Sequence, residues 1–296
     1  TALIRYSQDY GAMTMQAYSL TSRMLSDLVD LILDDIYAYD RNTVSYLNIN
    51  ILKPREWQKH YCHNALNVTV LACLIGKMEG MSRTQLKELG MGAMLHDIGN
   101  VRIPSNILHK SDRLTPAEYK QVQRHTEIGY DLLKYDDNVP PESALCALQH
   151  HERVDGRGYP QGLPSRLIHP YSKWVGLIDA YDALCNTRCY RGSYLPHVAM
   201  EALFAGAGSK FDMQMVQTFR NRVDIYPPGT PVRLSTGQRG IIARVTRLPL
   251  RPVVRILENE RGAELRTPYE VDLSQHLNIV IDQVTGCETT LLAHVR

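Results

Sequence analysis

Apolar side chains recur at helical spacing through most of the first 225 residues, and this pattern constrains the fold more than any other feature. Caps and breakers divide the pattern into helices over about 14–39, 54–78, 82–98, 115–134, 140–151, 172–185, 197–204 and 212–223. After residue 226 the pattern of apolar residues changes, and runs rich in valine and isoleucine predict strands at 232–234, 241–245 and 253–257. We therefore expect a mainly α protein that ends in a small β module.

One connection, residues 152–170, is too rich in glycine and proline for a regular element. Its breakers are Gly156, Gly158, Pro160, Gly162, Pro164 and Pro170. Loops of this length inside a compact domain usually carry function. We therefore look for functional residues in and around this loop.

Composition and charge exclude several classes of function. With 44% hydrophobic and 22% charged residues, the chain has a globular rather than a disordered composition. Its 33 basic and 31 acidic side chains leave a net charge of +2, which is too balanced to predict binding to DNA through phosphates. No apolar run approaches the roughly 20 residues that cross a bilayer, and no basic-then-apolar leader opens the chain. We expect a cytoplasmic protein without a membrane span, and the start at Thr1 suggests that the chain continues upstream.

Two aspartates stand in apolar helical sequence, where a charged carboxylate is costly unless it is paired or bound to a metal. Asp97 lies within residues 94–99 and Asp179 within residues 174–180. Histidines near helix ends offer partners: His63, His96, His125, His150 and His151. Imidazole and carboxylate together suit a transition metal, and a carboxylate that bridges two such ions favours hydroxide attack on a phosphodiester.

Each of these residues also has a structural interpretation. A lone histidine on a helix is more often a hydrogen-bonded structural residue than a ligand. Neighbours such as His150 and His151 point about 100° apart on a helix, so their adjacency adds little. Asp179 could cap a helix or pair with an arginine such as Arg188. Taken singly, these residues do not establish a metal site.

The segment from His150 to Pro160, HHERVDGRGYP, resembles the HHExxDGxGYP signature of HD-GYP domains at every fixed position. His63 resembles the first histidine of that family, and His96-Asp97-Ile98-Gly99 resembles its HD motif. His125 resembles its middle histidine, and Asp179 resembles its last ligand. The resemblance covers about residues 55–260 and includes the β tail. It implies an HD-type helical bundle around a binuclear metal site, with a small C-terminal β module.

The resemblance implies a metal-dependent phosphodiesterase that hydrolyses cyclic di-GMP to linear pGpG, to GMP or to both. It assigns one metal to His63, His96, Asp97 and Asp179, and the other to Asp97, His125, His150 and His151. Asp97 would bridge the two ions. We expect two divalent transition metal ions, with iron, manganese and nickel as the first candidates.

The same resemblance gives roles to individual residues. A bridging hydroxide would attack phosphorus in line, with catalytic roles for Asp97, His96 and Glu152. Glu152 and Asp155 are expected to fix the loop rather than to bind metal, and Gly156 and Gly158 to take positive φ. Substrate contacts are expected from Asn100, Tyr159, Arg188 and Arg191.

Two positions depart from the family pattern. The HD motif commonly continues HDIGK, with the lysine near a substrate phosphate, whereas the fifth residue here is Asn100. Losing that cation should weaken phosphate binding while leaving metal binding intact. Members with three metals carry a glutamate four residues before the first histidine, where this chain has Lys59. We therefore expect two metals, with a shifted pairing of Glu56 and His60 as the alternative.

The resemblance divides the chain into an N-terminal helical segment (1–52) that serves as linker or scaffold, a catalytic domain (53–225) and a β-rich module (226–296). Cyclic di-GMP and 3',3'-cyclic GMP-AMP remain alternative substrates. A second function class is a weakly active cyclic dinucleotide receptor that docks GGDEF-domain proteins, which Asn100 favours. A homodimer is left open.

Overall fold

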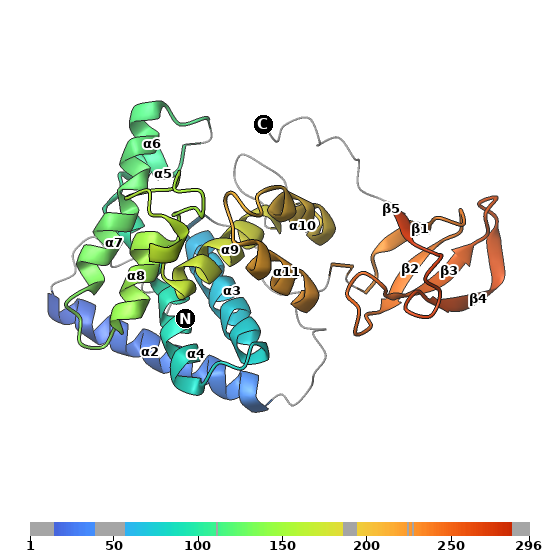
Figure 1. The fold of residues 1–296 in the computed structure, drawn as a ribbon, viewed down its shortest axis with the longest axis horizontal. Coiled ribbons are helices and arrows are strands. Elements are labelled where there is room, and N and C mark those ends of the chain that lie inside the picture. Colours follow the sequence, from blue (N-terminus) through green and yellow to red (C-terminus); the bar gives the residue numbers. More distant parts are fainter. Residues whose placement is uncertain are drawn as a thin grey trace. The chain divides into compact units, whose positions relative to one another are not determined.

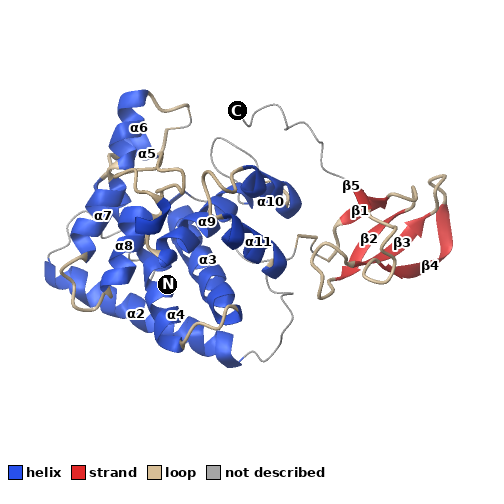
Figure 2. Ribbon diagram, viewed as in Figure 1, coloured by secondary structure: helices blue, strands red, loops and turns tan. Residues whose placement is uncertain are grey.

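The computed structural model describes residues 15–38, 57–110, 112–185, 194–223, 225–226 and 228–285, with side chains from residue 22 in the first segment and from residue 64 in the second (Figure 1). Within these residues the helices precede the strands along the chain (Figure 1), and Figure 2 distinguishes the helices from the strands by colour. The chain divides into two units, which meet in sequence between residues 219 and 220. We call them the helical unit and the strand unit. The expected mainly α fold with a small C-terminal β module is confirmed.

Three long helices open the helical unit: α2 (Met15–Ala38), α3 (Trp57–Met78) and α4 (Arg83–Leu95). Ser82 caps α4, as its sequence predicts, and it also forms a capping box with Gln85. Val29 and Leu33 of α2 are fully buried and share one apolar core with Leu86 of α4. This packing holds α4, whose C-terminal end leads into the HD motif.

The prediction that α4 continues to residue 98 is wrong. The helix ends at Leu95, and a 3-10 helix, η2 (Ile98–Arg102), follows. A Cβ atom at Gly99 would overlap the backbone carbonyl oxygen of His125. The chain therefore leaves the α-helical path where two backbones come into direct contact, and Asp97 lies in the turn between the two helices.

The helix expected over 115–134 is two helices, α6 (Pro116–Gln123) and α7 (His125–Leu133). Its start is as predicted, because Thr115 caps α6 and forms a capping box with Glu118. At Arg124 the amide donates to the carbonyl of Gln121, three residues back, and the α-helical ladder is interrupted. A short helix that the sequence did not indicate, α5 (Ser105–Leu108), precedes α6.

Four more helices follow: α8 (Pro141–Gln149), α9 (Pro170–Cys185), α10 (Pro196–Ala205) and α11 (Met213–Arg222), and the boundary between the units lies within α11. The predicted loop joins α8 to α9 and contains only a three-residue 3-10 turn, η3 (Ser165–Leu167). Phe219 of α11 is buried and meets Tyr181 of α9 edge to face, at 5.0 Å between ring centroids. Among the described residues no helix is both long enough and apolar enough to cross a membrane.

The strand unit is one antiparallel sheet with the order β4-β3-β2-β1-β5. The three predicted strands are confirmed as β1 (Pro231–Leu234), β2 (Arg239–Arg244) and β3 (Val253–Glu258). The sequence missed the two edge strands, β4 (Glu264–Asp272) and β5 (Ile281–Val284). β4 is largely exposed and contains Pro268, so it lacks the apolar alternation that marks a half-buried strand.

Candidate metal centre

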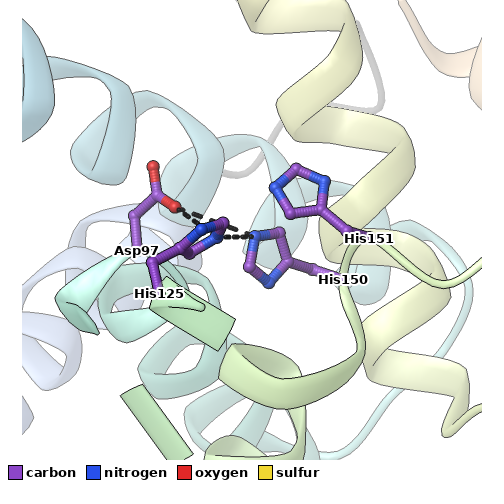
Figure 3. Close-up of side chains that lie close together, drawn as sticks. All are labelled: Asp97, His125, His150 and His151. Atoms are coloured by element: carbon purple, nitrogen blue, oxygen red, sulfur yellow. Dashed lines mark hydrogen bonds and ion pairs between the residues drawn. The ribbon is translucent and has the colours of Figure 1, made fainter. Parts of the chain in front are cut away.

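Four side chains from three helix ends converge in the helical unit. Asp97 follows α4, His125 opens α7, and His150 and His151 follow α8. One potential ligand atom from each lies within 4.8 Å of the others, and Figure 3 shows the four side chains gathered around a common point. We call this group the His/Asp cluster. The structure thus brings together four of the seven residues expected as metal ligands.

Backbone carbonyls fix the orientation of the imidazole rings. Nδ1 of His125 lies 2.6 Å from the carbonyl oxygen of Val122, and Nδ1 of His150 lies 2.9 Å from that of Cys146. A carbonyl can only accept, so each Nδ1 carries the hydrogen and each Nε2 keeps its lone pair. This is the arrangement in which histidine binds a metal through Nε2.

The ring nitrogens face one another at short range. Nε2 of His125 lies 3.3 Å from Nε2 of His150 and 3.3 Å from Oδ1 of Asp97 (Figure 3). Two lone pairs and a carboxylate oxygen at these distances repel one another unless a proton or a cation lies among them. The donor set therefore fits a bound metal ion.

His96 and Asp179 lie beside the cluster. His96 is completely buried, its Nδ1 is 2.7 Å from the carbonyl oxygen of Ala93, and its Nε2 has no hydrogen-bond partner among the described residues. That Nε2 lies 3.8 Å from Oδ2 of Asp97 and 3.7 Å from Oδ1 of Asp179. An unsatisfied buried nitrogen between two carboxylates fits a second metal position adjoining the first.

The protonation of these groups follows from their neighbours. Burial disfavours the charged form of His96 and by itself would lower its pKa. The combined attraction of the Asp97 and Asp179 carboxylates is the larger effect, and it raises the pKa of His96 to about 9. Burial lowers the pKa of His150 to about 3, and the neighbouring His96 and His125 act in the same direction. For Asp97, burial is opposed by the nearby histidines, which leave its pKa below the ordinary value. Asp97 is thus a carboxylate, and His150 is neutral at pH 7.

An asparagine pair that the sequence analysis missed holds the aspartates of α9. Asn64 of α3 donates from Nδ2 to Oδ1 of Asp179 at 3.1 Å and to Oδ2 of Asp182 at 2.8 Å. Asn67 donates to the other oxygen of Asp182 at 3.0 Å. The i, i+3 spacing within each pair was the available signal, because such residues share a helix face. His63 precedes Asn64 on α3, but its side chain lies outside the described residues.

The loop after His151 is fixed by the Glu152 carboxylate, which accepts hydrogen bonds from the backbone N–H groups of Gln161, Gly162 and Leu163 at 2.7, 3.1 and 2.9 Å. Asp155 pairs with Arg153, and its amide donates to the carbonyl of Ser209 at 2.9 Å. Both carboxylates therefore hold the loop, as expected. For Glu152 the geometry supports a positioning role rather than direct contact with reacting atoms.

The two glycines of the loop act in different ways. Gly156 has φ of 73°, as predicted. Gly158 does not have positive φ, so that expectation is wrong. A Cβ atom at Gly158 would instead overlap the backbone nitrogen of Arg153, which means that glycine is required there by the close approach of two chain segments.

Tyr159 covers one side of the cluster. Its ring stacks on that of His151, with 4.7 Å between centroids and 29° between planes, and burial raises the pKa of its hydroxyl. Asn100 lies in η2, three residues after Asp97, and its side-chain oxygen is buried without a hydrogen-bond partner in the described part of the chain. Arg188 and Arg191, also expected to contact substrate, lie outside the described residues.

Comparison with known proteins gives two family matches. A model described as an HD domain matches residues 23–215, and one described as a KOW domain associated with an HD domain matches residues 231–291. A relative named cyclic di-GMP phosphodiesterase response regulator RpfG, from Xanthomonas campestris pv. campestris, is 32% identical over 215 residues, which are 72% of this chain and 55% of the relative. A Vibrio cholerae relative named 3'3'-cGAMP-specific phosphodiesterase 2 is 28% identical over 233 residues, 73% of this chain and 44% of the relative.

The chain thus spans about half the length of these relatives. Among solved structures, Bd1817, an HDG"Y"P protein from Bdellovibrio bacteriovorus, matches with a TM-score of 0.54 at 20% identity. That match covers 70% of this chain and 63% of the other. At this identity the structural likeness supports the fold alone, and it agrees with the helical bundle described above.

Proposed function

This chain belongs to the HD-domain family, and on that premise we propose that it is a metal-dependent phosphodiesterase of a 3',3'-cyclic dinucleotide, with cyclic di-GMP as the first candidate substrate. One observation carries the proposal. Asp97, His125, His150 and His151 converge with potential ligand atoms within 4.8 Å, and carbonyls fix two of the rings with Nε2 facing inward. Such a donor set is typical of hydrolytic metal centres.

We infer a binuclear centre. Asp97, His125, His150 and His151 would hold one ion, and His63, His96, Asp97 and Asp179 the other, with iron, manganese or nickel suited to the imidazole-rich donors. Bound ions of this kind supply a hydroxide nucleophile and neutralise charge on phosphoryl oxygens. The chain itself contributes imidazole rings fixed by backbone carbonyls, the Asp97 carboxylate that both ions would share, and the Asn64 amide that donates to Asp179.

Substrate contacts are proposed for Asn100, Tyr159, Arg188 and Arg191. The Asn100 amide can donate a hydrogen bond to a phosphate oxygen, although it lacks the positive charge of a lysine. The stacking of Tyr159 on His151 supports a role for its ring beside the reacting phosphate. The proposed product is linear pGpG, GMP or both. Glu152 would act by positioning the loop that carries Tyr159.

Two alternatives are supported by particular observations. The Vibrio cholerae relative supports 3',3'-cyclic GMP-AMP as the substrate. Asn100 supports a receptor of low activity that docks GGDEF-domain proteins.

We further propose that residues 53–225 form the catalytic domain, that residues 1–52 and 226–296 are accessory, and that the reaction takes place in the cytoplasm. Analytical sedimentation of the chain tests whether it forms a homodimer. A pull-down with GGDEF-domain proteins tests whether it docks them.

The deciding experiment measures metal content and turnover on one anaerobic preparation. We expect about two metal ions per chain and hydrolysis of cyclic di-GMP or 3',3'-cyclic GMP-AMP in the presence of Mn²⁺ or Fe²⁺. His150→Ala and His151→Ala should lose metal and activity together. The control is His276→Ala, which removes an exposed histidine of the strand unit.

The other outcomes separate the alternatives. Full metal content with tight dinucleotide binding but no turnover in the wild type would support the receptor, and Asn100→Lys should then restore hydrolysis. Metal-free protein that neither binds nor hydrolyses a cyclic dinucleotide would refute the proposed function.

A further inference from the structure

A row of aromatic rings leads from the His/Asp cluster to the surface. The Tyr159 ring stacks on His151 at 4.7 Å and meets His125 edge to face at 6.5 Å between centroids. Tyr159 also contacts the ring of Tyr119 in α6, with 6.4 Å between the ring centroids and 78° between the ring planes. Tyr119 is thus the outermost ring of a row that starts at two of the expected metal ligands.

Tyr119 combines this contact with large exposure. It retains 48% of its accessible surface, whereas the Tyr159 side chain is only partly exposed. Because the two tyrosine rings are nearly perpendicular, Tyr159 can cover at most one face of the Tyr119 ring. At least one aromatic face beside the cluster therefore has no ring stacked on it among the described residues.

The helix that carries Tyr119 is held in place from its first turn. Thr115 and Glu118 form the capping box of α6, and the Lys110 ammonium binds the Glu118 carboxylate at 2.8 and 2.9 Å. Tyr119 directly follows Glu118 in the chain. These bonds give the ring a defined place relative to the loop opposite, which favours binding because little ordering is needed.

We propose that Tyr119 is a stacking platform for one purine base of the cyclic dinucleotide. This inference rests on the proposed function, since it requires a nucleotide phosphate at the His/Asp cluster. In a nucleotide the base is joined to the phosphate through one sugar, so a phosphate at the cluster places its base near the surrounding wall. Tyr119 and Tyr159 form the aromatic part of that wall, and an exposed aromatic face binds any purine by stacking.

A purely structural role makes a different prediction. If Tyr119 only supports Tyr159, its removal disturbs the ring on His151 and lowers kcat or metal content. If Tyr119 binds the base, its removal raises KM and Kd for the dinucleotide and leaves kcat and metal content unchanged. The pattern of kinetic change therefore separates the two roles.

The test uses the full chain loaded with Mn²⁺ and a non-hydrolysable phosphorothioate analogue of cyclic di-GMP. Tyr119→Ala should weaken its binding about tenfold, or about 1.4 kcal/mol, with kcat on cyclic di-GMP within about twofold of wild type. Tyr119→Phe keeps the ring and should bind within about twofold of wild type. The matched control is Tyr135→Ala, which removes an 83% exposed tyrosine of the same unit without a ring contact to the cluster.

A spectroscopic variant reports stacking directly. In Tyr119→Trp the introduced indole should lose fluorescence when the analogue binds, beyond the response of wild type, because a stacked purine quenches it. In Tyr135→Trp the same titration should give no added quenching.

The failures are distinguishable. Equal analogue affinity in wild type and Tyr119→Ala would overturn the inference and leave the proposed function standing. Loss of kcat or metal in Tyr119→Ala would assign Tyr119 to support of Tyr159 instead. A wild-type chain that binds no cyclic dinucleotide would overturn both.

Discussion

Histidine orientation is the residue-scale property on which the metal centre depends. His96, His125 and His150 each have Nδ1 against a backbone carbonyl oxygen three or four residues earlier, at 2.7, 2.6 and 2.9 Å. Each carbonyl belongs to the helical turn that comes just before its histidine. Helix ends thus provide both the acceptor for Nδ1 and the direction of Nε2.

The raised pKa of His96 predicts a pH dependence of the metal-free protein. Its pKa is about 9 in the folded chain and about 6.5 when unfolded, so protonated His96 stabilises the fold fully below pH 6.5. That contribution, roughly 3 kcal/mol, is lost as the pH rises through 9. Urea unfolding at several pH values measures it, and His96→Gln should remove the decline between pH 6.5 and 9. An identical decline in His96→Gln and in the control His276→Ala would contradict this prediction.

At the element scale, the centre depends on two places where backbone meets backbone. One is the contact of η2 with α7 at Gly99, and the other is the loop between α8 and α9, which is closed by Glu152 and by the tight approach at Gly158. These contacts fix the ends of helices, and the ligands are on those ends. Small changes in these contacts should therefore change the metal centre without touching a ligand.

Gly99→Ala tests the first contact. The added Cβ would overlap the His125 carbonyl, so η2 and α7 must separate, and we expect a loss of about 3 kcal/mol of stability together with weaker metal binding. Chemical denaturation and metal titration measure both. Gly129→Ala is the control, because its Cβ would lie 3.3 Å from its nearest neighbours, which include the Gly99 nitrogen, and should be accommodated at smaller cost. Equal effects of the two substitutions would argue against the role given to this contact.

Glu152→Gln tests the loop. The amide replaces one accepting oxygen by a donor that faces backbone N–H groups, so we expect a loss of about 2 kcal/mol in the closure of the loop. Hydrogen exchange at Gln161, Gly162 and Leu163 should become faster and kcat should fall, while metal content stays as in wild type. Glu127→Gln, at an exposed position of α7, serves as the control. Loss of metal in Glu152→Gln would instead identify this carboxylate as part of the donor set.

At the scale of the whole molecule, the His/Asp cluster belongs to one of the two compact units of the chain. Its residues come from α4, α7 and α8, whose core also includes Val29 and Leu33 of α2. The strand unit has its own buried residues, among them Val232, Ile242 and Val254. If the two units unfold separately, a ligand that binds the helical unit should stabilise that unit alone.

Metal removal tests this independence. Because binding to the native state adds RT ln(1 + [L]/Kd), metal at a hundred times its Kd should stabilise the helical unit by about 2.7 kcal/mol. Calorimetry should show two thermal transitions. Chelation of the metal should lower the midpoint temperature of one of them. His150→Ala should abolish that shift and leave the other transition unchanged. A single transition that moves as a whole would show instead that the units unfold together.

Sequence alone determined the features that depend on neighbouring residues. The cap residue Ser82 and the capping box of Thr115 predicted where α4 and α6 begin, because capping is decided within one turn. Runs rich in valine and isoleucine predicted the three inner strands. The HD-GYP signature, through its resemblance to a known family, gave the fold and the residues that meet in the His/Asp cluster.

Only the tertiary structure decided what depends on contacts between distant segments. The end of α4 and the break at Arg124 follow from the approach of η2 to α7, and no local pattern encodes that approach. The edge strand β4 forms by hydrogen bonding to β3 rather than by its own hydrophobicity. The pairing of Asn64 with Asp179 and of Tyr119 with Tyr159 joins residues from separate elements. Such contacts arise from packing, which a single sequence specifies only through the fold as a whole.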